Sequence, residues 1–176
     1  MSSQQEMLTK GDWIVHVHYG VGQIKGKDKK EFDGEKQTFF RVKTFNGVYW
    51  LPLSNSDADH IRPIASKNQI KRALRLIRKV PKKLPKDYKK RGKEISVVLR
   101  DVALYPKVRM IRDLYARKRT KKLNFSEGDA LEKMKKSFID EWSLVDDQDR
   151  DVLEGKLRQA LHTSLEKRKD QNGKEV

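Results

Sequence analysis

The sequence contains no cysteine, so neither a disulfide nor a thiolate-bound metal can stabilise the fold, and we expect a protein of a reducing compartment. It has no run of about 18 apolar residues, the length needed to cross a membrane as a helix. Its first residues, MSSQQEMLTKGD, lack the basic and apolar regions of a secretory signal, which leads us to expect a cytoplasmic protein. A chain of 176 residues is long enough for two small domains.

Positive charge is in excess, with a formal net charge of +16. Residues 67–125 contain 22 Lys or Arg and 4 Asp or Glu, whereas residues 1–66 contain 9 and 8, and residues 126–176 contain 10 and 13. An excess concentrated in one folded segment indicates a polyanionic partner. Nucleic acid is the polyanion that we favour, and an anionic membrane surface is the alternative.

Residues 11–63 have the pattern of a small β domain. Segments rich in β-branched and aromatic residues, WIVHV, GQIKG, QTFFRVKTF and VYWLPL, alternate with the turn sequences HYGVG, KDKKEFDGEK and NG. Asn46-Gly47 predicts a two-residue type I′ hairpin, which needs positive φ at both positions. We predict a small, strongly bent five-stranded β-barrel of the SH3 or Tudor type over residues 1–66.

After Pro63 the apolar spacing becomes helical. Ser66 is predicted to cap a helix that ends before Pro81, and Asp87 a second helix after a stiff lysine-rich connector. Further helices are expected near Pro106, at Ser126 and after the acidic run 146–151, with a disordered tail from about residue 169. The predicted apolar stripes are Ile70, Ala73, Leu74 and Ile77; Ile95, Val98, Leu99 and Val102; Val108, Ile111, Leu114 and Tyr115; Leu131, Met134, Phe138 and Trp142; and Leu153, Leu157, Leu161 and Leu165. The fold class is therefore α+β, a β-barrel followed by an all-α domain of about five helices over residues 67–176.

The N-terminal part resembles the RNA-polymerase-interacting domain of the CarD family, which also occurs in transcription-repair coupling factors. The shared features are Gly11-Asp12, a hydrophobic strand, His16, the run Tyr19-Gly20-Val21-Gly22, and a later strand reaching Pro52. The helical half is similar in order: PKDYKKRGKEI stands at the family's aromatic-plus-basic DNA element, KVRMIRDLYARKR at its VRDL helix, and LNFSEGDALEKMKKSFIDEWSLV at its L-S-x-x-E helix. No helicase motor follows, so we expect a free-standing member.

The resemblance implies a non-enzymatic bacterial transcription regulator that binds the β-subunit lobe of RNA polymerase and contacts promoter DNA at the upstream edge of the bubble, stabilising the open complex. It implies no cofactor, and we expect a monomer associated with the nucleoid. The barrel would offer the polymerase an exposed edge strand, and the polymerase-binding residues would be Lys30, Val48, Tyr49 and Trp50. The DNA-binding residues would be Lys86, Tyr88, Lys89, Lys90, Arg91 and Lys93. Tyr88 replaces the wedging tryptophan of well-known members, so we expect a weaker wedge.

Other interpretations of these residues remain open. Trp50 could belong to the barrel core, Tyr88 could cover Leu84 and Pro85, and the basic run 117–122 could be a solvated helix end. His16 and His18 share one side of a strand but lack a third ligand, which favours packing and turn hydrogen bonding over a metal site. No catalytic signature is present, so we expect no enzyme. The alternative function is a general double-stranded nucleic-acid or ribosome-associated binding module.

Overall fold

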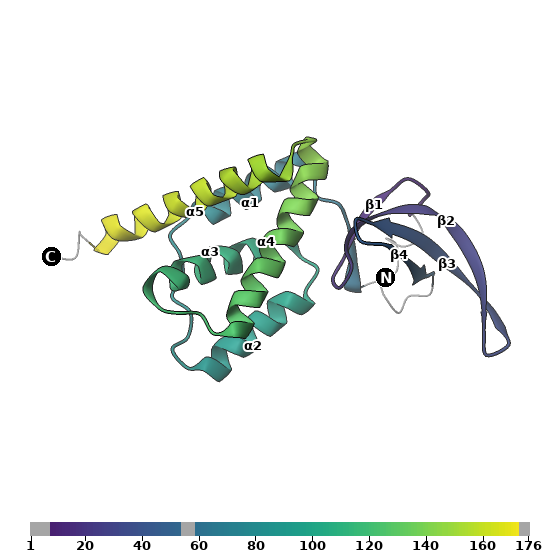
Figure 1. Ribbon diagram of the computed structural model, residues 1–176, viewed down its shortest axis with the longest axis horizontal. Helices are drawn as coiled ribbons and strands as arrows, with labels where there is room; N and C mark the ends of the chain where they lie inside the picture. The colour runs from purple at the N-terminus through teal and green to yellow at the C-terminus, as the bar shows by residue number, and fades with distance from the viewer. Residues whose placement is uncertain (1–7, 54–58, 173–176) are drawn as a thin grey trace. The chain divides into compact units, whose positions relative to one another are not determined.

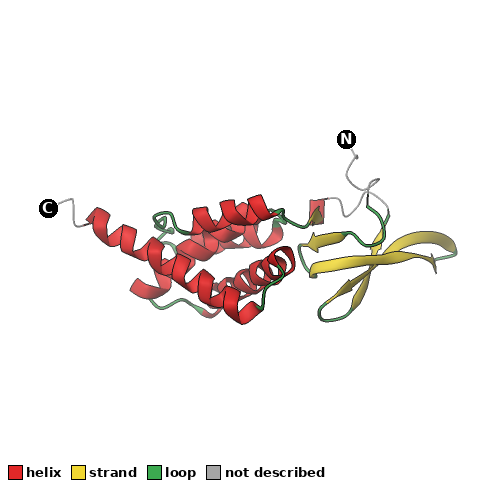
Figure 2. Ribbon diagram, turned by 90° about the horizontal axis from the view of Figure 1, so that it is seen from above, coloured by secondary structure: helices red, strands yellow, loops and turns green. Residues whose placement is uncertain are grey.

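The chain divides into two compact units, Met1–Ile64 and Ala65–Val176. The computed structural model describes residues 8–53 and 59–172. Within these residues, the first unit contains the strands and the second contains the helices (Figures 1 and 2). This is the predicted α+β order. None of the helices in the described residues combines the length and the apolar character that a bilayer crossing requires.

The N-terminal unit is one antiparallel sheet in the order β4-β3-β2-β1-β5. Its apolar side chains alternate along the strands, so one face of the sheet supplies the core. The strands are β1 (Trp13–His16), β2 (Gly20–Phe32), β3 (Glu35–Thr44), β4 (Val48–Pro52) and β5 (Ile61–Pro63). The core consists of Ile14, Ile24, Phe40, Val42, Tyr49, Leu51 and Ile61.

Two hairpin predictions for this sheet are wrong. The segment 27–36, predicted as a loop, is mostly strand, because β2 and β3 continue as a long ribbon to a two-residue turn. That turn is Asp33-Gly34, whose φ angles of 51° and 81° match the type I′ geometry. At Asn46-Gly47 the type I′ turn is absent, since Asn46 has no positive φ and the last cross-strand pair is Lys43 with Val48. The outer part of this ribbon is exposed and has charged side chains on both faces, so it lacks the alternation of apolar and polar residues by which a strand is predicted.

The turn between β1 and β2 is organised by His16 and two glycines. The His16 Nδ1 atom accepts hydrogen bonds from the backbone N–H of His18 at 3.0 Å and of Tyr19 at 3.4 Å. Gly20 has a φ of 70°, and a Cβ atom on Gly22 would lie 2.6 Å from a Val42 methyl group. The predicted turn hydrogen bonding of His16 is therefore confirmed. No group of three His, Cys, Asp or Glu in the described residues could hold a metal ion.

The described part of the C-terminal unit is a bundle of five helices in which α3 contacts all the others. Ser66 and Asp87 cap α1 and α2 as predicted, and Ser66 forms a full capping box with Gln69. The helices are α1 (Lys67–Ile77), α2 (Tyr88–Arg100), α3 (Leu104–Thr120), α4 (Phe125–Asp146) and α5 (Arg150–Asn172). The predicted stripes supply most of the buried core, including the stacked rings of Phe138 and Trp142.

Three details of the helical prediction are wrong. Helix α4 begins earlier than Ser126, because Asn124 and Glu127 form a capping box around its first turn. Val102 follows the end of α2 at Arg100 and so is not on its stripe. Helix α5 continues to Asn172, so residues 169–172 are helical, and the rest of the predicted disordered tail lies outside the described residues.

Buried polar contacts fix the connector between α1 and α2 on the bundle. The carboxylate of Asp113 on α3 accepts a 2.8 Å hydrogen bond from the backbone N–H of Lys82 and a 2.7 Å bond from Arg112 Nε. The Ser164 hydroxyl on α5 donates to the carbonyl of Lys79 at 2.6 Å. Because these bonds are shielded from water, they hold the connector in one conformation just before α2 begins.

Candidate protein and nucleic-acid interfaces

Strand β4 presents backbone groups at an edge of the sheet. Among the described strands it has a neighbour only on its β3 side. The backbone bonds from Thr44 N–H to Gly47 O and from Leu53 N–H to Thr38 O fix the phase of the β3–β4 ladder. Since hydrogen-bonded and non-hydrogen-bonded pairs alternate, the backbone N–H and C=O groups of Val48 and Trp50 point away from β3. These groups can pair with a strand of another protein.

A cluster of polar contacts holds Trp50 on the solvent-facing side of the sheet. Its indole N–H donates to Asp28 Oδ2 at 2.8 Å, and Asp28 also pairs with Arg41 at 3.5 Å. The Lys30 ammonium lies 3.2 Å from the centre of the Trp50 ring, a cation–π contact. Trp50 is 40% exposed and Val48 is exposed beside it. Trp50 is thus a surface residue and not part of the barrel core.

Tyr49, also predicted to contact a partner, faces the opposite way. Strand alternation turns its side chain into the sheet core, where it is 9% exposed and its ring stacks on Tyr19 at 4.3 Å. The side chain is therefore unavailable to a partner protein, and the prediction for Tyr49 is corrected. Lys30, Val48 and Trp50 remain accessible.

The predicted DNA-binding residues lie at the start of α2 and just before it. Tyr88 is the first residue of the helix and is 64% exposed, so covering Leu84 and Pro85 does not account for its position. Lys86, Lys89, Lys90 and Lys93 are exposed as well. The one acidic residue in this segment, Asp87, is engaged in the helix cap. Its carboxylate accepts a hydrogen bond from the backbone N–H of Lys90 at 2.8 Å. The result is an exposed ring with four exposed lysines within five residues of it in the sequence.

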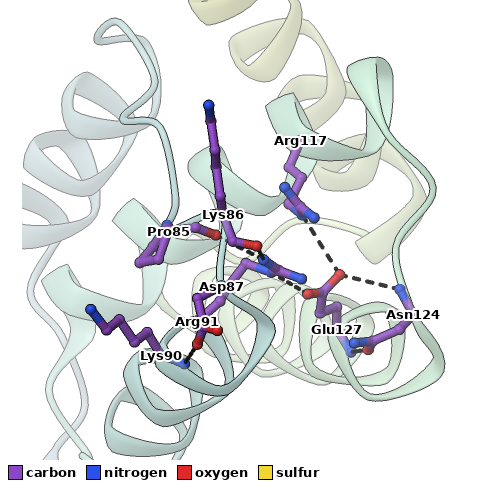
Figure 3. A network of polar contacts seen from close by, with 8 residues as sticks. All are labelled: Pro85, Lys86, Asp87, Lys90, Arg91, Arg117, Asn124 and Glu127. Carbon is purple, nitrogen blue, oxygen red and sulfur yellow. Dashed lines mark hydrogen bonds and ion pairs between the residues drawn. The ribbon is translucent and has the colours of Figure 1, made fainter.

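Arg91 does not belong to this exposed set. It is 4% exposed, and its guanidinium bonds to the Glu127 carboxylate on α4 and to the carbonyls of Pro85 and Lys86 at 2.8 and 3.0 Å (Figure 3). All of these partners are inside the protein, so Arg91 is unavailable to phosphate. The prediction that it binds DNA is corrected: Arg91 fixes the segment that carries Tyr88.

Glu127 connects three elements of the bundle. Besides binding Arg91, it completes the capping box with Asn124 and lies 3.7 Å from the guanidinium of Arg117 at the end of α3 (Figure 3). A buried carboxylate between two buried or half-buried cations is strongly favoured over either charge alone. Sequence reasoning missed this network, although the spacing Asn-x-x-Glu at 124–127 is a capping-box signal that could have been found.

Some cations of the basic run 117–122 contact other residues of the protein, and others are exposed to solvent. Arg117 faces Glu127, and Arg119 donates to the Tyr115 hydroxyl at 2.9 Å. Lys118, Lys121 and Lys122 are exposed. The run is therefore in part a structural helix end and in part an accessible cationic surface.

The sheet has an accessible edge strand, and the helical unit has an exposed aromatic ring among lysines. This combination is expected of a protein that binds both a protein partner and nucleic acid. Two family models match the chain: residues 8–65 match the CarD-like/TRCF RID domain and residues 72–158 match the CarD C-terminal domain. The chain therefore belongs to the CarD family, as its sequence resemblance predicted. RID domains are Tudor-like and interact with RNA polymerase, so this chain is a transcription factor that interacts with RNA polymerase.

A curated relative supports this assignment. The chain is 26% identical over 141 residues to the Bacillus subtilis (strain 168) protein named "Putative transcription factor YdeB". The match covers 79% of this chain and 92% of YdeB. Neither of the two matching domain families is an enzyme family.

Proposed function

We propose that this protein binds the β-subunit lobe of bacterial RNA polymerase and contacts promoter DNA at the upstream edge of the transcription bubble, on the nucleoid, so that the open complex lasts longer. The observation that carries the proposal is the exposed Tyr88 ring among four lysines, at the start of a helix fixed by buried ion pairs, in a chain with a polymerase-interacting domain. Such a ring can pack against an unstacked base step while the lysines neutralise phosphates.

The polymerase contact would use the edge of β4. Backbone pairing at Val48 and Trp50 would supply affinity, and the Lys30–Trp50 pair on the adjoining face would supply selectivity. Tethering to polymerase raises the effective concentration of the helical unit at the DNA, so the helical unit needs only modest DNA affinity of its own.

We expect Trp50→Ala and Lys30→Glu each to weaken binding of the full chain to purified RNA polymerase by about tenfold or more, as for a typical interface anchor. The first change removes the exposed ring, and the second places a carboxylate on it. Titration by biolayer interferometry without DNA measures both. Lys36→Glu is the matched control, since it makes the same charge change on the other face of the ribbon. An equal loss in the control would show a general charge effect instead of a specific interface.

The DNA contact predicts a defined response to salt. If the protein neutralises about six phosphates, the logarithm of its duplex affinity should fall with the logarithm of salt concentration at a slope of roughly −5. Replacing the lysines at 86, 89, 90 and 93 with glutamine should reduce the magnitude of that slope by about 3 to 4. Lys133→Gln with Lys135→Gln is the control, because these lysines pair with acids on their own helix. An unchanged slope in the quadruple variant would place the phosphate contacts elsewhere.

If the chain binds duplex DNA and not polymerase, the general nucleic-acid module becomes the better account of its function. The polymerase titration therefore separates the two functions directly.

A further inference from the structure

Phe125 is a large apolar side chain with no packing role in the fold. It is the first residue of α4 and is 90% exposed, more than Tyr88. The start of the helix is stabilised by Asn124 and Glu127 and does not need an aromatic residue. A single exposed apolar residue is common on protein surfaces, so only the surroundings of Phe125 can indicate a ligand.

The surroundings of Phe125 are cationic. Lys118 at the end of α3 and Lys121 and Lys122 just after that helix are exposed. The nearby carboxylates are already paired: Glu127 lies in the buried network, Asp129 pairs with Lys133 at 2.8 Å, and Glu132 pairs with Lys135 at 3.0 Å. The uncompensated charge around the ring is therefore positive, which complements phosphate.

A hollow of about 450 Å³ lies beside the same turn. Leu123 and Leu131 contribute apolar surface to it, and Lys118 and Lys122 contribute cations. Its remaining lining residues are Gly128 and Glu132. A cavity of this size falls within the range of small-molecule sites, roughly 300–1,000 Å³, and has room for a nucleobase.

The buried network brings this turn to the same end of the bundle as Tyr88. Glu127, two residues after Phe125, binds Arg91, three residues after Tyr88. Figure 3 shows the chain neighbours of both rings, Asn124 and Asp87, around that pair. One DNA molecule could thus reach both rings.

We propose that Phe125 with Lys118, Lys121 and Lys122 forms a second nucleic-acid contact, which binds the unpaired strand of a DNA fork. Bases in a duplex have both faces covered by stacking, whereas an unpaired base offers a free face to an exposed aromatic ring. The lysines would hold the phosphates of that strand, and the hollow would receive a base. The choice of a fork as ligand rests on the proposed contact of Tyr88 with DNA at a bubble edge.

The test compares two labelled DNAs by fluorescence anisotropy with the full chain: a blunt duplex, and the same duplex with an unpaired arm. Phe125→Ser should weaken fork binding about fivefold or more, the loss expected for one stacked base, and change duplex binding less than twofold. Phe125→Trp should preserve the preference for the fork. Val152→Ser is the control, because Val152 is 52% exposed but directly follows Asp151 in an acidic segment, and it should change neither affinity.

Equal losses on both DNAs, or no loss on either, would overturn the second contact. Tyr88→Ser in the same assay separates this inference from the proposed function. If Tyr88→Ser weakens binding and Phe125→Ser does not, only the second contact fails. If Phe125→Ser selectively weakens fork binding while Tyr88→Ser changes nothing, the wedge fails and the second contact stands. Absence of a preference for the fork in the unmodified chain would overturn the second contact, whereas the proposed function is tested by the open-complex lifetime with polymerase present.

Discussion

Glu127→Ala is expected to lower the free energy of unfolding of the helical unit by about 3–5 kcal/mol, the range for breaking a buried ion pair from one side. The substitution leaves the guanidinium of Arg91 buried without its carboxylate, removes the partner of Arg117, and opens the capping box of α4. Urea unfolding followed by far-ultraviolet circular dichroism at 222 nm measures the effect, since the described helices all lie in this unit.

Glu132→Ala is the matched control for this prediction. Glu132 is on the same helix, is exposed, and pairs only with Lys135 one turn away. Removing such a pair should change stability by less than about 0.5 kcal/mol. If the two variants lose the same stability, the buried network does not have the role that its geometry indicates.

Tyr88→Ala is expected to shorten the lifetime of an open promoter complex about tenfold, which corresponds to about 1.4 kcal/mol and lies within the range for one aromatic–base contact. Because the side chain is 64% exposed, its loss should leave the stability of the bundle within about 0.5 kcal/mol of the original. Tyr88→Trp, with a larger ring face, should lengthen the lifetime. Competitor challenge of preformed complexes made with polymerase measures the lifetime with the original protein and with each variant.

Val97→Ala provides the comparison for Tyr88→Ala, since Val97 is similarly exposed on the same helix but is not aromatic. We expect it to leave the lifetime unchanged. An open complex equally long-lived with Tyr88→Ala would exclude the wedge and move attention to the lysines or to Phe125.

Local chemistry explains which parts of the fold could be predicted from sequence. Ser66 and Asp87 cap their helices through bonds that span three residues, and the apolar stripes of α1 and α3 follow from helical spacing alone. The β2–β3 ribbon was missed because its outer half has charged residues on both faces, so alternation gives no signal. The start of α4 was misplaced because Ser126 is also a good cap, and only the observed bonds show that Asn124 is the one used.

The candidate site was predicted only in part, for a different reason. Arg91 has the same sequence neighbourhood as Lys90 and Lys93, yet it is withdrawn from the surface by Glu127, 36 residues later. Tyr49 and Trp50 are adjacent, and the pairing of β4 with β3 decides which of them faces solvent. In the first case the deciding partner is 36 residues away, and in the second it is a strand pairing that exists only once the sheet has formed.

By itself, the sequence determined the α+β order, the helix caps, the basic middle third and the resemblance to the CarD family, because each depends on composition or on residues within a few positions of one another. The tertiary structure decided which cations remain accessible to a ligand, which aromatic rings reach solvent, and where Phe125 lies relative to Tyr88. Burial and ion pairing depend on contacts between segments far apart in the chain, and these exist only once the bundle and the sheet have formed.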